Sequence, residues 1–193
     1  MRHSLTRHLT GFLAALCLSV PAALLVSTPA SAADTAACDK DGTTAADSAL
    51  ASQLNSQLTG DMRGVMNAYR VSCARIIAAT VKSRGLPVRV AQIAITTTIP
   101  ESRIQNLTYG DRDSIGLYQQ RPSQGWGSVE QIMNPVYSTN KFVSKLLTLD
   151  WRNDAIGKLC QDVQVSGFPQ RYYDATADGV AIANGYCSTS LFC

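Results

Sequence analysis

The N-terminal segment decides how much of this chain is left to fold, because its pattern is typical of a segment that is cleaved off. Residues 1–10 carry basic side chains, residues 11–26 (GFLAALCLSVPAALLV) are almost wholly apolar, and Ala30-Ser31-Ala32 resembles a cleavage site. This order is typical of a secretory signal peptide, and an apolar run interrupted by Pro21 is short for a membrane span. We therefore predict that residues 1–32 are a signal peptide and that the mature protein is secreted, without stable membrane insertion.

Cleavage would leave 161 of the 193 residues, enough for one domain with a hydrophobic core. Two of the 17 basic residues lie in the signal segment, so 15 basic residues would face 14 acidic ones. A charge this close to zero gives no electrostatic reason to expect nucleic acid or an anionic membrane as a partner. We expect a monomer that binds neither.

Histidine is absent from the predicted mature chain, because His3 and His8 both lie in the signal segment. Ser-His-Asp and Cys-His catalysis need an imidazole base, and zinc hydrolases usually need histidine ligands. The chain also has no HExxH, no CxxC and no glycine-rich nucleotide motif. We expect no metal and no cofactor, so any catalysis would come from carboxylates, hydroxyls and amides.

Five cysteines would survive cleavage, in a compartment that favours disulfides: Cys38, Cys73, Cys160, Cys187 and Cys193. We expect two disulfides and one spare thiol. Five choices of the spare thiol and three pairings of the rest give 15 connectivities, and all of them stay open.

Helical periodicity dominates the rest of the chain. Residues 33–46 are small, polar and unpatterned, which predicts a flexible leader before a domain over 47–193. A leucine stripe from Leu50 predicts a first helix that Gly60 ends, and Asp61 is the expected N-cap of a stronger second helix.

The apolar run 88–99 (VRVAQIAITTTI) fits either a strand or a buried helix. Pro100 is expected to end or kink this element just before Glu101, because proline lacks an amide donor.

Further helices are expected to start at Ser128, at Asn134-Pro135, at Asp154 and at Phe168-Pro169, the last of these ending near Gly185. Five or six helices with few strand signals predict a mainly α domain.

Glu101 is one of only two glutamates, and it follows the apolar stretch IAITTTIP. Glycoside hydrolysis needs a carboxylic acid that stays protonated near neutral pH, and burial against apolar groups raises a carboxyl pKa in that way. Arg103 is expected to point elsewhere and leave that pKa unaffected. Glu101 is therefore a candidate catalytic acid, with a solvated helix end as the alternative interpretation.

Glu101-Ser102 followed by Gly116-Leu117-Tyr118-Gln119 resembles the E-S … G-L-x-Q signature of lytic transglycosylases and goose-type lysozymes. The string GDRDSIGLYQQRPSQGWG, at residues 110–127, is similar to a secreted bacterial branch of that superfamily. The likeness covers residues 85–173 and also includes NPVY at 134–137, Trp151, QDVQ at 161–164, SGFP at 166–169 and Tyr172.

The resemblance implies a lysozyme-like, mainly α domain with disulfides that acts on peptidoglycan glycan strands. Glu101 would protonate the β-1,4 bond between N-acetylmuramic acid and N-acetylglucosamine and then act as a base. Ser102 and Gln119 would hold the substrate or the glutamate, and Gly116 would let the glycan approach the backbone. Asp111 and Asp113 are candidates for a second carboxylate, although the loop GDRDS also fits a self-capping turn with Arg112.

Aromatic and amide side chains complete the candidate site. Trp126 and Tyr118 could stack on sugar rings or pack on the core. Two features depart from the family pattern, namely Pro100 before the glutamate and the lack of a recognisable tyrosine-asparagine segment. Tyr172 or Tyr173, with Gln164 on the preceding helix, are candidates to take the place of that segment.

The leading hypothesis is a secreted or cell-wall-associated peptidoglycan-cleaving enzyme, a lytic transglycosylase rather than a hydrolase. One alternative is a lysozyme-fold module that binds peptidoglycan without cutting it. The other is a disulfide-stapled secreted protein with an interaction role, in which Glu101 is merely exposed.

Overall fold

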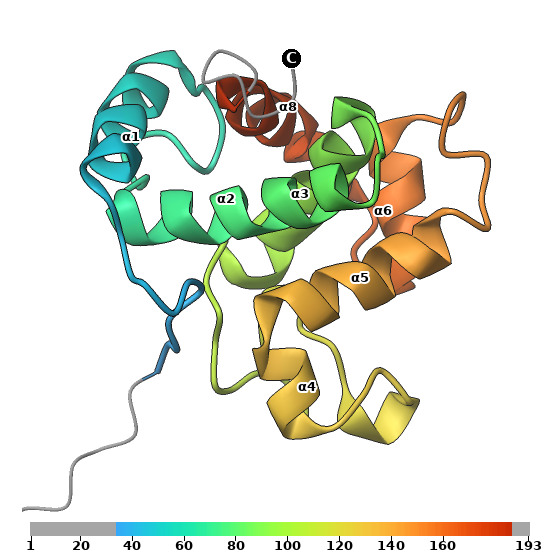
Figure 1. The fold of residues 1–193 in the computed structure, drawn as a ribbon. Helices are drawn as coiled ribbons and strands as arrows, with labels where there is room; N and C mark the ends of the chain where they lie inside the picture. The colour runs from blue at the N-terminus through green and yellow to red at the C-terminus, as the bar shows by residue number, and fades with distance from the viewer. Residues whose placement is uncertain (1–33, 187–193) are drawn as a thin grey trace, which may run out of the picture. The chain divides into compact units, whose positions relative to one another are not determined.

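The computed structural model describes residues 34–186, and this part of the chain is mainly helical, as predicted (Figure 1). Two isolated β-bridges, Thr35 with Leu107 and Ile115 with Gln120, are the extended pairings within these residues. The elements are α1 (Ala45–Gln57), α2 (Ala68–Ser83), α3 (Val88–Ser102), the 3₁₀ turn η1 (Pro122–Gln124), α4 (Val129–Met133), α5 (Pro135–Leu146), α6 (Ile156–Gln164), α7 (Gln170–Asp174) and α8 (Thr176–Gly185). The predicted signal peptide lies outside the described residues. No helix between residues 34 and 186 is long and apolar enough to cross a membrane.

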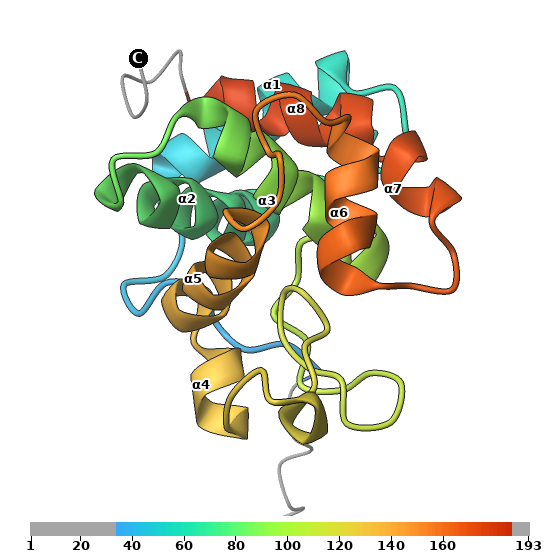
Figure 2. The ribbon, with the colours of Figure 1, turned by 90° about the vertical axis from the view of Figure 1, so that its right-hand side faces the viewer.

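Helix α3 is the centre of the packing, in contact with α2, α5, α6, α7 and α8 (Figures 1 and 2). All residues from Ile93 to Ile99 are buried, because neighbouring helices cover this part of α3 on every side. Thr97 and Thr98 are tolerated there since their hydroxyls donate to the carbonyls of Ile93 and Ile95 one turn back. The ambiguous run is therefore a helix, and its β-branched residues reflect complete burial.

Pro100 was expected to end or kink the element just before Glu101, and the first alternative is wrong because helix α3 continues through Pro100. The φ of proline is compatible with a helix, although the amide donor is lost and the ring crowds the carbonyl one turn back. The helix ends instead at Arg103, which adopts a left-handed conformation and whose N–H bonds to the carbonyl of Ile99 at 3.0 Å. Glu101 therefore lies in the last turn of the most buried helix.

The predicted flexible leader is held in place over its described part, so that prediction is wrong. A disulfide joins Cys38 to Cys73 on α2, and Arg75 binds Asp39 at 2.7 Å and Asp47 at 2.9 Å. The small polar residues of the leader suggested disorder, because long-range contacts such as these leave no periodic pattern in the sequence. The leader belongs to the same compact unit as the helices that follow it.

Several helix boundaries also differ from expectation. Helix α2 begins after Asn67, whose side chain accepts from the N–H of Arg70, so Asp61 is not its N-cap. Asp154 precedes α6 but forms an ion pair with Lys158 instead of capping the helix. The segment expected as one last helix forms both α7 and α8, which brings the α-helices between residues 34 and 186 to eight.

The starts of α4 and α5 are confirmed, because Ser128 and Asn134 cap them with their side chains.

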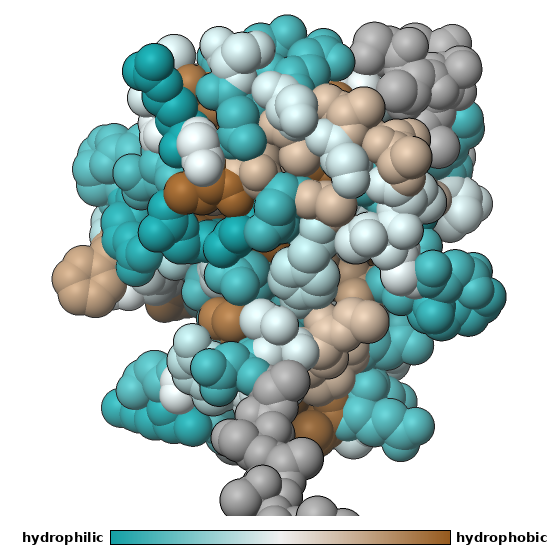
Figure 3. Space-filling view, turned by 90° about the vertical axis from the view of Figure 1, so that its left-hand side faces the viewer, coloured by the Kyte–Doolittle hydropathy of each residue, from teal (hydrophilic) through white to brown (hydrophobic). Residues whose placement is uncertain are grey.

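The face that carries α1 is mostly hydrophilic, with apolar residues in separate small patches (Figure 3).

Candidate active site

Glu101 meets a tyrosine that lies 71 residues away in the sequence. The hydroxyl of Tyr172, on α7, donates to Oε1 of Glu101, and the tyrosine side chain is buried. Burial and the neighbouring Glu101 raise the pKa of Tyr172, so its hydroxyl stays protonated and remains a donor. Of the two tyrosines expected as candidates, Tyr172 contacts the glutamate, while Tyr173 is 45 % exposed and packs beside Gly157.

Burial raises the pKa of Glu101 above the ordinary value of 4.5. Hydrogen bonds from Tyr172 and Gln164 and the charge of Arg171 act in the opposite direction, but the cost of desolvating the carboxylate prevails. Arg103 is not among the groups that shift this pKa, as expected, and its guanidinium donates to the carbonyl of Asp61. Glu101 is therefore a carboxyl group that keeps its proton to a higher pH than an exposed glutamate.

Arg171 and Gln164 connect the elements that surround Glu101. Arg171 donates to the carbonyl of Pro100 at 2.8 Å, and Gln164 donates to the carbonyl of Tyr118 at 2.7 Å. Gln164 thus links Glu101 to the loop before η1.

A cavity of about 950 Å³ opens beside Glu101. Its lining comes from the end of α3, the loop around η1, α5 and the segment from the end of α6 to α7. The predicted residues that reach it are Glu101, Asp111, Gln119, Trp126 and Gln164.

The aromatic side chains divide between this cavity and the core. Trp126 lines the cavity, with the ammonium of Lys145 5.1 Å from the centre of its ring. Tyr118 has no exposed surface and stacks on Phe142 with ring centres 4.8 Å apart. Of the two interpretations of Tyr118, packing on the core is therefore correct and stacking on sugars is wrong. Phe168 lines the cavity with 69 % of its surface exposed, and sequence reasoning missed it. The signal available was its place between Gly167 and Pro169, in a connection between helices, because such segments usually run over the surface.

Ser102 and Gly116 serve the fold and do not line the cavity, so the contacts predicted for them are wrong. The buried hydroxyl of Ser102 donates to the carbonyl of Leu117 at 2.7 Å. Gly116 has a φ of 78°, and a Cβ there would lie 3.0 Å from the carbonyl oxygen of Ile132. Both residues fix the loop of the G-L-x-Q motif against α3 and α4.

Gln119 reaches the cavity but is held by its own loop. Its side-chain nitrogen donates to the carbonyls of Tyr109 and Gly116, both at 3.2 Å. An amide nitrogen carries two hydrogens, so neither remains for Glu101.

The two candidate second carboxylates lie in different environments. Asp113 accepts from Nε of Arg121 at 2.6 Å and from the N–H of Ser123 at 2.8 Å, and these bonds hold its pKa well below the usual range. Asp113 is therefore an ionised turn residue outside the cavity lining. Asp111 lines the cavity, but its side chain is 92 % exposed and lies 3.9 Å from Arg112, as the alternative turn interpretation expected.

Cys160, on α6, is the free thiol among the described residues. It is fully buried near Glu101 and Tyr172. Its Sγ donates to the carbonyl of Ile93 at 3.6 Å, and burial raises its pKa to about 12. Cys187 and Cys193 lie outside the described residues, so the predicted second disulfide stays a prediction.

Between residues 34 and 186 no group of three or more histidine, cysteine, aspartate or glutamate side chains is arranged to hold a metal ion. No family model matches the chain, and no curated protein matches its sequence.

Proposed function

We propose that this chain is a secreted peptidoglycan-cleaving enzyme with a lysozyme-like helical domain, in which Glu101 is the catalytic acid and base. The observation that carries the proposal is a carboxyl group with a raised pKa at the edge of a large polar cavity. Such a group keeps its proton to a higher pH than an exposed glutamate and still faces a substrate, which favours protonation of a glycosidic oxygen.

In the proposed reaction, Glu101 donates its proton to the oxygen between N-acetylmuramic acid and N-acetylglucosamine as the bond from that oxygen to C1 breaks. The glutamate, now ionised, accepts a proton from the nucleophile that attacks C1. In a transglycosylase the nucleophile is the 6-hydroxyl of the same muramic acid, and the product is a 1,6-anhydro ring. In a hydrolase it is water. Tyr172 positions the carboxyl group through its hydrogen bond to Oε1.

The transglycosylase outcome is favoured by the state of the other carboxylates. An inverting hydrolase needs a second carboxylate to activate water. Asp113 is bound by Arg121 and Ser123, and Asp111 lies on the solvent side of the cavity. A 6-hydroxyl is carried by the substrate and needs no second carboxylate.

A non-catalytic peptidoglycan-binding module is the second candidate, and a specific observation favours it. Three residues of the expected motif are engaged in contacts that hold the motif loop: Ser102 with Leu117, Gly116 against Ile132 and Gln119 with Tyr109. A protein that kept the cavity but lost catalysis would retain such a loop for its structural role.

Digestion of purified peptidoglycan tests the proposal, with the fragments identified by mass spectrometry. Glu101→Gln should lower the rate of release about 10²–10⁴-fold, because it keeps the size of the side chain and removes the transferable proton. Glu130→Gln, which changes the other glutamate on the exposed surface of α4, is the matched control and should digest like the wild type. Fragments with 1,6-anhydro ends identify a transglycosylase and reducing ends a hydrolase. Binding to the polymer with no release of fragments by the wild type would establish the binding module instead.

A further inference from the structure

The positive charge lining the cavity is only partly balanced. Four basic residues line it: Arg121, Lys141, Lys145 and Arg171. Arg121 is paired with Asp113, whereas no ion pair among the described residues involves the other three. The excess is local, because the predicted mature chain is close to neutral as a whole. Glu101 and Asp111 line the same cavity, so its lining carries an excess of positive charge over these two carboxyl groups. A concave surface with such an excess concentrates ligands of the opposite sign.

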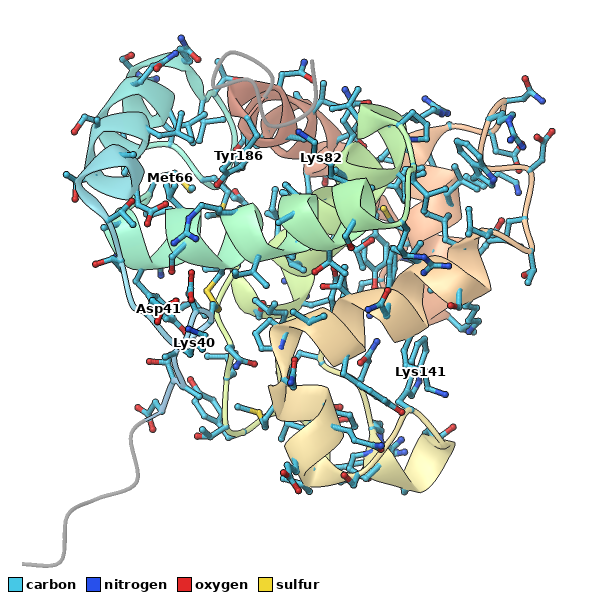
Figure 4. All side chains as sticks on the ribbon, in the orientation of Figure 1. Lys40, Asp41, Met66, Lys82, Lys141 and Tyr186 are labelled. Carbon is cyan, nitrogen blue, oxygen red and sulfur yellow. A yellow bond between two sulfur atoms is a disulfide. The ribbon has the colours of Figure 1, made fainter. Side chains whose placement is uncertain are left out.

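Lys141 and Lys145 form the basic wall of the cavity, one turn apart on α5. Lys145 is fixed, because its ammonium donates to the carbonyl of Val163 and lies over the ring of Trp126. Lys141 is exposed and, within residues 34–186, makes no hydrogen bond or ion pair. Figure 4 shows it projecting from α5 toward the segment that contains η1. The wall thus offers one fixed cation beside an aromatic ring and one cation without a partner.

We propose that the basic wall binds carboxylates carried by the glycan and makes the cavity selective for carboxylate-bearing strands over neutral N-acetylglucosamine polymers. This inference rests on the proposed function, since it assigns the substrate class of the same cavity. A neutral sugar can stack on Trp126 but offers no charge to the ammonium of Lys141. Peptidoglycan carries carboxylates in two places, on the lactyl group of muramic acid in strands without peptides and on the stem peptides.

Binding measurements on the Glu101→Gln protein separate recognition from cleavage. Three soluble ligands of equal length are titrated by calorimetry: an N-acetylglucosamine oligomer, peptide-free glycan strands and peptide-bearing strands. We expect tighter binding of at least one carboxylate-bearing ligand, with a preference that weakens as salt is added. Lys141→Gln in the same background should reduce the ratio of anionic to neutral affinity about two- to five-fold, and Lys141→Glu should reduce it further.

Lys40→Gln is the matched control, because Lys40 is also an exposed lysine but pairs with Asp41 on the leader, away from Lys141 (Figure 4). Preference for peptide-free strands over the neutral oligomer assigns the lactyl carboxylate, and preference for peptide-bearing strands alone assigns the stem peptide. Equal affinity for all three ligands, or equal effects of Lys141→Gln and Lys40→Gln, would overturn the inference.

The digestion described above decides the proposed function separately. Cleavage by the wild type without any preference in binding would overturn the basic wall alone. A preference that depends on Lys141 without cleavage would support the basic wall while removing catalysis from the proposal.

Discussion

At the scale of single residues, Glu101 couples the stability of the fold to pH. Its pKa in the folded protein is raised above the ordinary value of 4.5, so the folded state holds this proton more tightly than the unfolded chain does. Linkage then requires that Glu101 contribute stability below its unfolded pKa, and that this contribution be lost as the pH rises through the folded pKa. Above that range the protein keeps a buried carboxylate at a cost in stability.

Glu101→Gln should remove this dependence, because an amide of the same size has no proton to lose. The variant should gain stability relative to the wild type as the pH rises from 4 to 7.5, as measured by urea unfolding at both pH values. The exposed Glu130→Gln serves as the control and should show no such trend. If both variants changed with pH in the same way, the carboxyl group of Glu101 would not be buried as described.

At the scale of elements, short-range sequence signals predicted where helices start better than they predicted how the helices pack. Ser128 and Asn134 correctly predicted the starts of α4 and α5, because a capping side chain acts on backbone groups two or three residues away. The run 88–99 stayed ambiguous because a helix covered on all sides has no polar face to reveal its period. The expected end of the helix at Pro100 was wrong for a related reason. Contacts from other elements maintain a helix that local propensity would end.

Residues around the cavity were predictable only in the segments that carry the resemblance, and not all of the residues predicted there reach it. Tyr118 and Gln119 are neighbours in the motif, yet one is in the core and the other faces the cavity. Lys141 and Phe168 reach the same cavity from separate segments, and no local pattern relates them to Glu101. Tyr172 was a candidate by resemblance, but its contact with Glu101 depends on how α7 packs on α3.

The contact between α3 and α8 supplies a prediction in which two effects oppose each other. Gly179→Ala should stabilise an isolated helix by about 1 kcal/mol, because alanine has the higher helix propensity. In the folded protein the new Cβ would lie 2.1 Å from Oγ1 and 2.6 Å from Cα of Thr96, and backbone atoms of a buried helix cannot yield. We therefore expect a net loss of about 1–3 kcal/mol in the free energy of unfolding.

Gly185→Ala in the same helix is the comparison, because the three atoms nearest to its Cβ would be leucine side-chain atoms, the nearest at 3.1 Å. Thermal and urea unfolding of both variants measures the difference. Stabilisation by Gly179→Ala would mean that α3 and α8 are not packed this closely.

At the scale of the whole molecule, the leader is linked to the site through the loop that follows α3. The N–H of Ala36 bonds to the carbonyl of Asn106 at 2.9 Å, and Thr35 and Leu107 form a β-bridge. The same loop then runs to Gly116, whose N–H bonds to the carbonyl of Leu107 at 2.7 Å. The covalent bond between Cys38 and Cys73 therefore stabilises a segment on which the motif loop is built.

Removal of this disulfide should destabilise the protein globally. The two cysteines are 35 residues apart, and a closed loop of that length restricts the unfolded chain by about 3–4 kcal/mol at 25 °C. The double variant Cys38→Ala/Cys73→Ala avoids leaving an odd thiol, and its urea midpoint should fall accordingly. Asp39→Asn, which weakens the ion pair with Arg75 but keeps the disulfide, should cost about 1 kcal/mol or less. A double variant no less stable than Asp39→Asn would show that the noncovalent contacts alone hold the leader, and that the covalent bond adds little to them.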